Sequence, residues 1–147
     1  MKAFILCAAA AAVLTGCGGG GGGSTPASTT TSSTTNTAPA VKCTYPEAGN
    51  TMQLQIRSTA GEQDITDTSK RLNILITGTS NDMKLGPCVY VESLAISGTS
   101  NEVKSDASSR IGAVIFNAES TSNLVWTNTA SNTTVSDLGT SNRVNRD

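Results

Sequence analysis

The chain has 147 residues, which is room for one domain, and its 10 basic and 11 acidic side chains nearly cancel to a net charge of −1. This balance gives no basic surface for a phosphate backbone, so no nucleic acid partner is predicted. The chain contains no histidine, which excludes Ser-His-Asp and Cys-His catalysis and every metal site built on imidazole.

The first element in chain order is a predicted lipoprotein signal peptide, residues 1–16. Lys2 supplies a positive charge, and the apolar run that follows is about a dozen residues long, too short to span a bilayer. Residues 14–17 read Leu-Thr-Gly-Cys and resemble the lipobox of bacterial lipoproteins. The resemblance implies cleavage before Cys17 and attachment of acyl chains such as palmitate, so we expect a membrane anchor at the cell envelope. Gly18 stands where inner-membrane retention uses Asp, which points to the outer membrane in a Gram-negative host.

Residues 17–40 are predicted to be the acylated cysteine and a flexible linker. Six consecutive glycines are followed by a stretch composed almost entirely of Ser, Thr, Ala, Pro and Asn. Such a composition cannot bury enough apolar surface to offset the entropy of ordering. As a flexible coil the linker spans roughly 25 Å, so the domain that follows is expected to float close to the membrane.

Residues 41–147 contain an internal repeat. The tripeptide Thr-Ser-Asn recurs four times, with its asparagines spaced 20, 22 and 19 residues apart, and alternating apolar residues precede most copies. A period near 20 is typical of a solenoid, and period-2 alternation predicts short strands. We therefore predict an all-β domain, a small β-solenoid of about four to five rungs. Its turns would place Gly and Asn at positive φ, and side-chain amides would stack into a ladder formed by Asn81, Asn101, Asn123 and Asn142.

The ends of the repeat are less regular. Residues 50–54 carry a faint first copy, and the polar residues 58–71 are predicted to loop out between it and the second rung. The last rung ends in the charged residues 143–147, which would form a polar end cap over the open edge.

The repeats of residues 72–145 resemble a family known as domain of unknown function 3060, in which Gly-[Ser/Thr]-x-Asn-x-Val recurs about every 20 residues. This resemblance implies no activity, and no catalytic residue is carried over from it. Glu119 and Ser120 stand where the other turns have a glycine as second residue, which predicts a weaker third turn.

Cys43 and Cys88 form an even pair in an exported chain, which favours a disulfide between them. The chain-entropy estimate for a loop of this length is about 4 kcal/mol of stabilisation. Two unpaired buried thiols are the alternative. With the disulfide formed, residues 41–47 would be attached to the second rung and would serve as the cap that a solenoid end needs.

The predicted register sets the outward side chains. Asp82 stacks on Glu102, with Lys84 and Lys104 beside them, and we interpret this group as a solvated, salt-bridged face. The alternative is a carboxylate pair for metal or glycoside chemistry, which needs a cleft that a regular solenoid face does not offer.

Leu124 and Trp126 also point outward in this register and would form an exposed apolar spot. The alternative is a slip by one residue, which would bury both side chains and turn Val125 outward. Without a catalytic constellation, we expect a non-enzymatic envelope protein with a structural or binding role and no metal or cofactor. Its partners would be the membrane, through the lipid anchor, and an envelope glycan or protein. A glycan-binding module that uses Leu124 and Trp126 is the second hypothesis.

Overall fold

The computed structural model describes residues 41–147, so the predicted signal peptide, Cys17 and the linker lie outside the described residues. Ten strands make up the described part: Thr51–Ile56 (β1), Thr59–Ile65 (β2), Arg71–Ile76 (β3), Thr79–Leu85 (β4), Tyr90–Ile96 (β5), Glu102–Ser105 (β6), Arg110–Phe116 (β7), Leu124–Thr127 (β8), Thr134–Asp137 (β9) and Arg143–Arg146 (β10). Nothing in residues 41–147 forms a helix that could span a bilayer.

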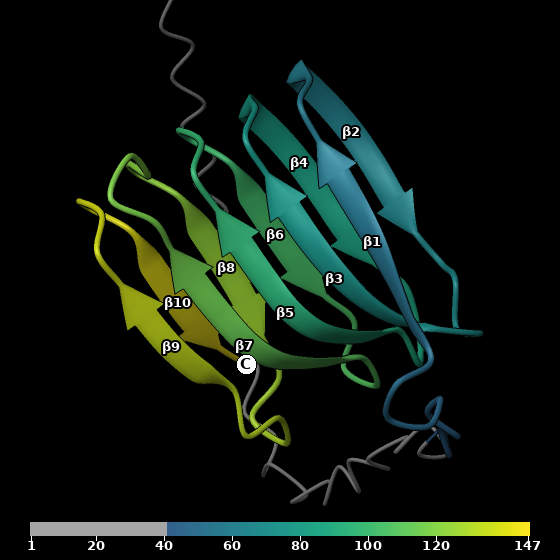
Figure 1. Ribbon diagram of the computed structural model, residues 1–147. Helices are drawn as coiled ribbons and strands as arrows, with labels where there is room; N and C mark the ends of the chain where they lie inside the picture. Colours follow the sequence, from purple (N-terminus) through teal and green to yellow (C-terminus); the bar gives the residue numbers. More distant parts are fainter. Residues whose placement is uncertain (1–40) are drawn as a thin grey trace, which may run out of the picture. The chain divides into compact units, whose positions relative to one another are not determined.

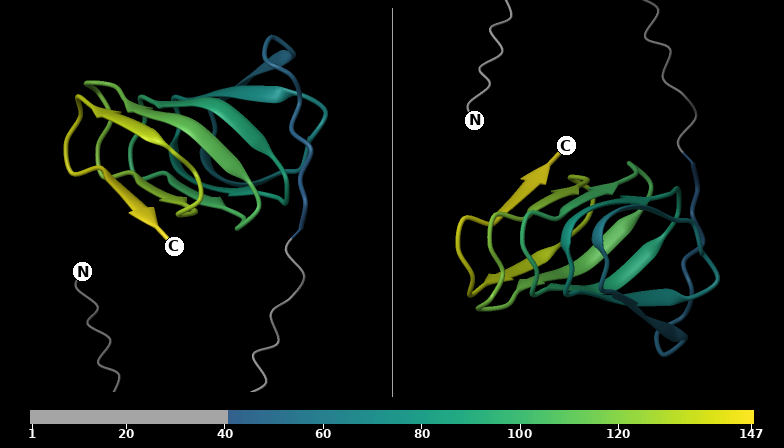
Figure 2. Two further views of the ribbon diagram at one scale, coloured as in Figure 1. Left: turned by 90° about the horizontal axis from the view of Figure 1, so that it is seen from below. Right: turned by 90° about the horizontal axis from the view of Figure 1, so that it is seen from above.

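The strands form two five-stranded sheets in which every pair is parallel (Figure 1). The odd sheet has the order β1-β3-β5-β7-β9 and the even sheet the order β10-β8-β6-β4-β2. Two successive strands, one in each sheet, make one coil, and five coils are stacked along the axis (Figure 2). The predicted all-β solenoid is thus confirmed.

Apolar side chains of both sheets meet between the sheets and form the core. In β3 the exposed fractions alternate, and Leu72, Ile74 and Ile76 are at most 2% exposed. Buried apolar residues take the corresponding inward positions in β5 and β7, with one register shift, since Leu72 pairs with Val91 but Asn73 pairs with Ser93. The even sheet contributes a shorter inward row of Met83, Val103 and Val125, all fully buried. Burying such a side chain stabilises the fold by about 1.5–3 kcal/mol.

Residues 58–71 do not loop out, so that prediction is wrong. Residues 59–65 form β2, which pairs with β4 and places Gly61 opposite Asn81. Ala60 has a φ of 59°, close to the 55° of Ser80 in the next coil. The first coil therefore makes the same turn without the Thr-Ser-Asn sequence.

The predicted assignment of positive φ to Gly and Asn in the turns is also wrong. The residue with positive φ is the middle one of each tripeptide: Ser80, Ser100, Ser122 and Ser141. The preceding glycines are needed for another reason, since a Cβ on Gly98 would lie 1.8 Å from the carbonyl oxygen of Gly78. Close stacking of the turns at Gly78 and Gly98 therefore requires that Gly98 has no side chain. In the third turn Ser120 takes the glycine position and is fully buried.

The Cys43–Cys88 disulfide is present, as predicted, with the two Cα atoms 5.2 Å apart. Residues 41–47, here called the strap, do not cap the end of the solenoid, which corrects the prediction. The strap lies along the loops that join one coil to the next (dark blue in Figure 1). The Tyr45 hydroxyl donates to the Ser108 carbonyl at 2.7 Å, and Ser108 lies in the loop that joins the third coil to the fourth. Because the disulfide partner lies in the middle of the stack, the strap is held to its side.

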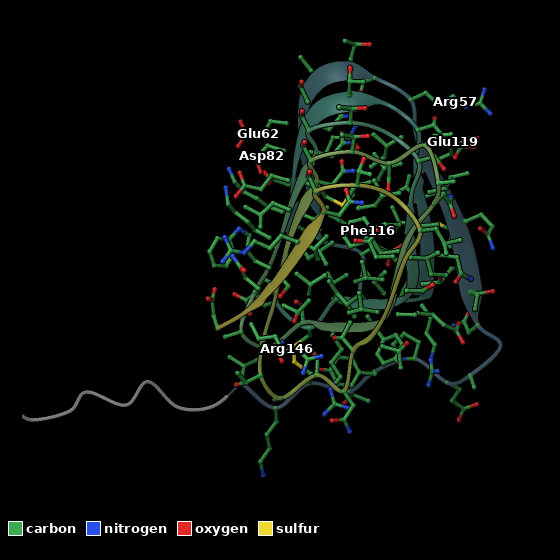
Figure 3. The ribbon with its side chains drawn as sticks, turned by 90° about the vertical axis from the view of Figure 1, so that its left-hand side faces the viewer. Arg57, Glu62, Asp82, Phe116, Glu119 and Arg146 are labelled. Atoms are coloured by element: carbon green, nitrogen blue, oxygen red, sulfur yellow. A yellow bond between two sulfur atoms is a disulfide. The ribbon has the colours of Figure 1, made fainter. Side chains whose placement is uncertain are left out.

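The C-terminal coil carries charges at inward positions. Asp137 pairs with Phe116 in the register of the odd sheet, and Arg146 pairs with Thr127 in the even sheet. Figure 3 views this end of the solenoid, with Phe116 between the sheets and Arg146 at the rim. The Arg146 guanidinium donates to the Thr133 carbonyl at 3.0 Å. Inward-pointing charges at a sheet edge discourage pairing with a strand of another chain. The last coil is therefore a polar end of the solenoid.

Candidate functional site

A buried column of asparagine side chains fixes the register of the even sheet. Each amide nitrogen donates to the amide oxygen of the next asparagine, at 2.9, 3.0 and 2.9 Å along the column. Each of these oxygens also accepts the backbone N–H of the preceding asparagine. The predicted ladder is therefore formed by side chains and backbone together, and it runs through Asn81, Asn101, Asn123 and Asn142.

Both ends of the ladder are closed by side chains of this chain. The Ser58 hydroxyl donates to the amide oxygen of Asn81 at 2.6 Å. At the other end the Asn142 amide nitrogen donates to the Ser120 hydroxyl at 2.9 Å and to Asp137 at 3.0 Å. No amide of the column is left without a partner, which meets the requirement for polar groups in a packed interior.

The register that follows from the ladder turns Leu124 and Trp126 outward. Val125 between them is fully buried and packs in the core. The pairing of β8 places Leu124 between Glu102 and Arg143, and Trp126 between Lys104 and Asn145. The slip by one residue does not occur, and the two side chains are half-buried on the outer face of the even sheet.

The indole of Trp126 is held by a neighbour on β6. Its Nε1 donates to Glu102 Oε1 at 3.0 Å, and Lys104 Nζ contacts Glu102 Oε2 at 3.1 Å. The hydrogen bond from Lys104, followed by the weaker one from Trp126, holds the pKa of Glu102 below its usual range, although partial burial opposes the change. A hollow of about 360 Å³ adjoins the ring and is lined by Lys104, Ser105, Trp126 and Asp147.

The remaining outward columns of the even sheet form ion pairs. Lys84 pairs with Glu62, and Lys104 lies 3.7 Å from Asp82. Glu62 and Asp82 project from this face in Figure 3. The hydrogen bond from Lys84 lowers the pKa of Glu62 and raises its own. Asp82 and Glu102 are neighbours that share Lys104, and such exposed pairs contribute little to stability.

The outer face of the odd sheet is different in character. Its two central rows contain no charged side chain: Gln53, Asn73, Ser93, Ala113 and Thr134 form one, and Gln55, Leu75, Ala95, Ile115 and Ser136 the other. The two outward rows of the even sheet hold seven charged side chains among ten positions. Trp126 and Leu124 therefore interrupt a charged face, and this contrast marks them as the candidate site.

The contact between Glu102 and Trp126 was missed by the sequence interpretation, which assigned Glu102 only to the salt-bridged group. The signal was available, because Glu102 and Trp126 occupy diagonal positions of adjacent outward columns and long side chains reach that distance. The hollow was not predictable, since it depends on where the chain turns after β10 and on the position of Asp147.

A scan of this chain against models of protein families finds no match, and neither do searches among curated proteins and among solved structures. The resemblance to domain of unknown function 3060 therefore stays a prediction. Function is therefore inferred from the chemistry of the site itself.

Proposed function

We propose that this chain is a non-enzymatic protein of the bacterial cell envelope, tethered to a membrane by lipid on Cys17, with a structural or binding role. The lipobox-like motif and the linker-like composition support the tether. The observation that favours binding is the outward Trp126, next to Leu124, on a face that is otherwise charged. Trp126 is half-buried and points outward, and aromatic side chains that are partly accessible at a surface are common at contact sites.

Two features of residues 41–147 support a non-enzymatic role. Both cysteines of this part are joined in the disulfide, so neither is a free nucleophile. Four carboxyl groups have a displaced pKa, and in each of them the pKa is lowered, chiefly by a hydrogen bond from a nearby side chain. Lys84 lowers the pKa of Glu62 and Lys104 that of Glu102. Ser69 lowers the pKa of Asp67 and Ser108 that of Asp106. A general acid at neutral pH needs a raised pKa instead.

The tether is tested by metabolic labelling. The full chain is produced in a bacterial host fed with an alkyne-bearing palmitate, and the label on the purified protein is read after coupling to a fluorophore. We expect labelling of the wild type and of Cys7→Ser, because Cys7 lies within the predicted signal peptide. Cys17→Ser is expected to lose the label and to leave the membrane fraction. Labelling of Cys17→Ser equal to the wild type would contradict the proposal.

A second candidate function, glycan binding through Leu124 and Trp126, is favoured by the groups around the indole. A sugar ring stacks on an aromatic face while its hydroxyl groups bond to nearby polar groups. The hollow beside Trp126 offers the ammonium of Lys104 and the carboxylate of Asp147. The hydrogen bond to Glu102 fixes the ring in place, which lowers the entropy lost when a ligand binds.

This second function is tested by the fluorescence of Trp126, the single tryptophan of the chain. The full chain in a mild detergent is titrated with soluble peptidoglycan fragments and with neutral oligosaccharides, and quenching by acrylamide is measured at each step. A bound sugar is expected to shield the indole and to reduce quenching in a saturable manner. If no oligosaccharide changes the quenching, Trp126 is not a sugar platform.

A further inference from the structure

The strap brings a tyrosine to a column of arginine and tyrosine on the odd sheet. Arg71, Tyr90 and Arg110 occupy the first positions of β3, β5 and β7. The Tyr45 and Tyr90 ring centroids are 5.5 Å apart in an edge-to-face arrangement. Arg71 Cζ lies 4.6 Å from the centroid of Tyr90, and Arg110 Cζ lies 4.8 Å from that of Tyr45. The four side chains thus form a row in which the two tyrosine rings contact each other and each ring also contacts one guanidinium group.

The two guanidinium groups differ in their remaining contacts. Arg71 Nε donates to the Pro46 carbonyl at 2.8 Å, and the side chain is half-buried. Arg110 is exposed, and among residues 41–147 no carboxylate oxygen lies within 4.0 Å of it, since the ion pairs there involve Lys84 and Lys104. A guanidinium that stacks on a ring keeps the N–H groups of its edge available for a planar oxyanion.

Arg110 stands between two hollows. One, of about 210 Å³, is lined by Tyr45, Ser108 and Asn128 together with Arg110 and its neighbours. The other, of about 140 Å³, is lined by Tyr90, Ser131 and Asn132, again with Arg110. The volume of each hollow is below the roughly 300 Å³ at which pockets for drug-sized ligands begin. Each hollow is therefore suited to a smaller group, such as a single sugar ring.

We propose that Arg110 and its two flanking hollows bind an acidic sugar, a uronic acid unit within a polysaccharide. The planar carboxylate would accept two parallel N–H bonds from Arg110. The Asn128 amide nitrogen already donates to backbone carbonyls and its Oδ1 accepts the Ser131 hydroxyl, so a sugar hydroxyl in this hollow would donate to the second lone pair of Oδ1. In the other hollow a hydroxyl would bond to Asn132, and Tyr45 and Tyr90 would form the apolar walls. This site lies on the strap, the start of the odd strands and the loops before β7 and β9, and it shares no lining residue with the hollow beside Trp126, so the two proposals stand or fall separately.

The disulfide has a part in this site. Tyr45 follows Cys43 by two residues, and Cys43 is bonded to Cys88. Reduction would release the strap and remove one wall of the larger hollow. Binding of the acidic sugar is therefore expected to weaken when the disulfide is reduced, whereas binding at Trp126 would stay the same.

The experiment is an NMR titration of the ¹⁵N-labelled full chain in detergent with trigalacturonic acid, a short uronic acid oligomer. We expect a saturable shift of the Arg110 Nε–H signal, together with Tyr45 and Tyr90 ring signals. Arg110→Gln should weaken binding at least tenfold. Arg57→Gln is the matched control, because Arg57 is an exposed arginine that donates to Gln55 and follows the last residue of β1, at the other end of the strands from Arg71, and it should bind as the wild type.

A second variant separates recognition from packing. Arg110→Lys keeps the positive charge over Tyr45 but not the planar pair of donors, so it should fold and still lose several-fold in affinity. The proposal would be overturned by the absence of a saturable shift in the wild type, or by wild-type affinity of Arg110→Gln. Equal binding of the uncharged methyl ester, or displacement of the oligomer by an equal concentration of inorganic phosphate, would also overturn it.

Discussion

The side-chain amide of Asn101 uses all of its hydrogen-bonding capacity inside the corner of the solenoid. Its nitrogen donates to the Gly78 carbonyl and to Asn123, and its oxygen accepts the backbone and side-chain N–H groups of Asn81. Asn101 is 1% exposed. A polar group so placed is tolerated in the interior only because every donor and acceptor has a partner.

Asn101→Ala should accordingly destabilise the domain by about 3 kcal/mol, because it leaves buried donors on Asn81 and a buried carbonyl on Gly78 without partners. Urea unfolding followed by circular dichroism measures this loss. Asn73→Ala is the matched control, since Asn73 lies on the outer face of the odd sheet, and its cost should stay below about 0.5 kcal/mol. Equal losses for the two variants would show that the ladder does not stabilise the fold.

The contact between Glu102 and Trp126 makes a pH-dependent signal. The pKa of Glu102 is lowered from its ordinary value of 4.5 by Lys104 and Trp126, so its contribution to stability is present above that ordinary value and is lost as the pH falls through the lower folded value. Trp126 fluorescence should therefore change with a midpoint below pH 4.5. Glu102→Gln should remove the transition, and a midpoint at or above pH 4.5 would contradict the assignment.

In the turns between the two strands of a coil, each residue of Thr-Ser-Asn and the preceding glycine has its own role. The serine takes the left-handed conformation, the asparagine builds the ladder, and the glycine allows two turns to approach each other. In the first coil Ala60 and Gly61 preserve the turn but supply no amide, and Ser58 closes the ladder instead. The repeat is thus one backbone shape with side chains that differ at the ends.

Gly98→Ala should destabilise the domain by about 3 kcal/mol, because the added Cβ would lie 1.8 Å from the Gly78 carbonyl oxygen and two coils would have to separate. Gly61→Ala should cost less than about 1 kcal/mol, since its Cβ would meet only side-chain atoms of Asn81 and Ser58, at 3.4 Å or more. Thermal unfolding of the two variants side by side makes the comparison. A smaller loss for Gly98→Ala than for Gly61→Ala would refute the close-approach explanation.

The sequence predicts those elements that repeat and fails at those that do not. Alternating apolar residues and the period of the asparagines are enough for the coils and the ladder, whereas the direction of Trp126 stayed open between the outward register and a slip by one residue. The strand β2 was missed because Ala60 and Gly61 carry no part of the Thr-Ser-Asn signal. The strap was expected at the wrong place, since the pairing of Cys43 with Cys88 says which residues meet but not on which side the intervening chain passes.

The site at Arg110 was not predicted from the sequence, because it combines repeat residues with a residue outside the repeat. Arg71, Tyr90 and Arg110 recur at the period of the coils, with spacings of 19 and 20 residues, and that signal was available. Tyr45 lies outside the repeat and reaches Arg110 only through the fold of the strap. A contact between a repeat and a non-repeating segment has no periodic signature in one sequence.

For the whole molecule, the two ends and the two faces of the solenoid determine how it can meet a partner. The ladder is closed at both ends within the chain, and inward charges stand in the last coil, so stacking a second copy would add no amide bond to the column. The outer faces differ, one being neutral in its central rows and the other charged around Trp126. We infer that partners meet the domain from the side.

The most direct test of a binding role for the face around Trp126 is co-sedimentation of the full chain, in a mild detergent, with purified peptidoglycan and with a panel of insoluble neutral polysaccharides. The wild type is predicted to sediment with at least one of them, and Trp126→Ala should lose most of that binding. Leu138→Ala is the control, because Leu138 is 71% exposed and follows β9 in the other sheet. If Trp126→Ala sediments as well as the wild type, or if the wild type sediments with none of them, the face around Trp126 is not a glycan-binding site.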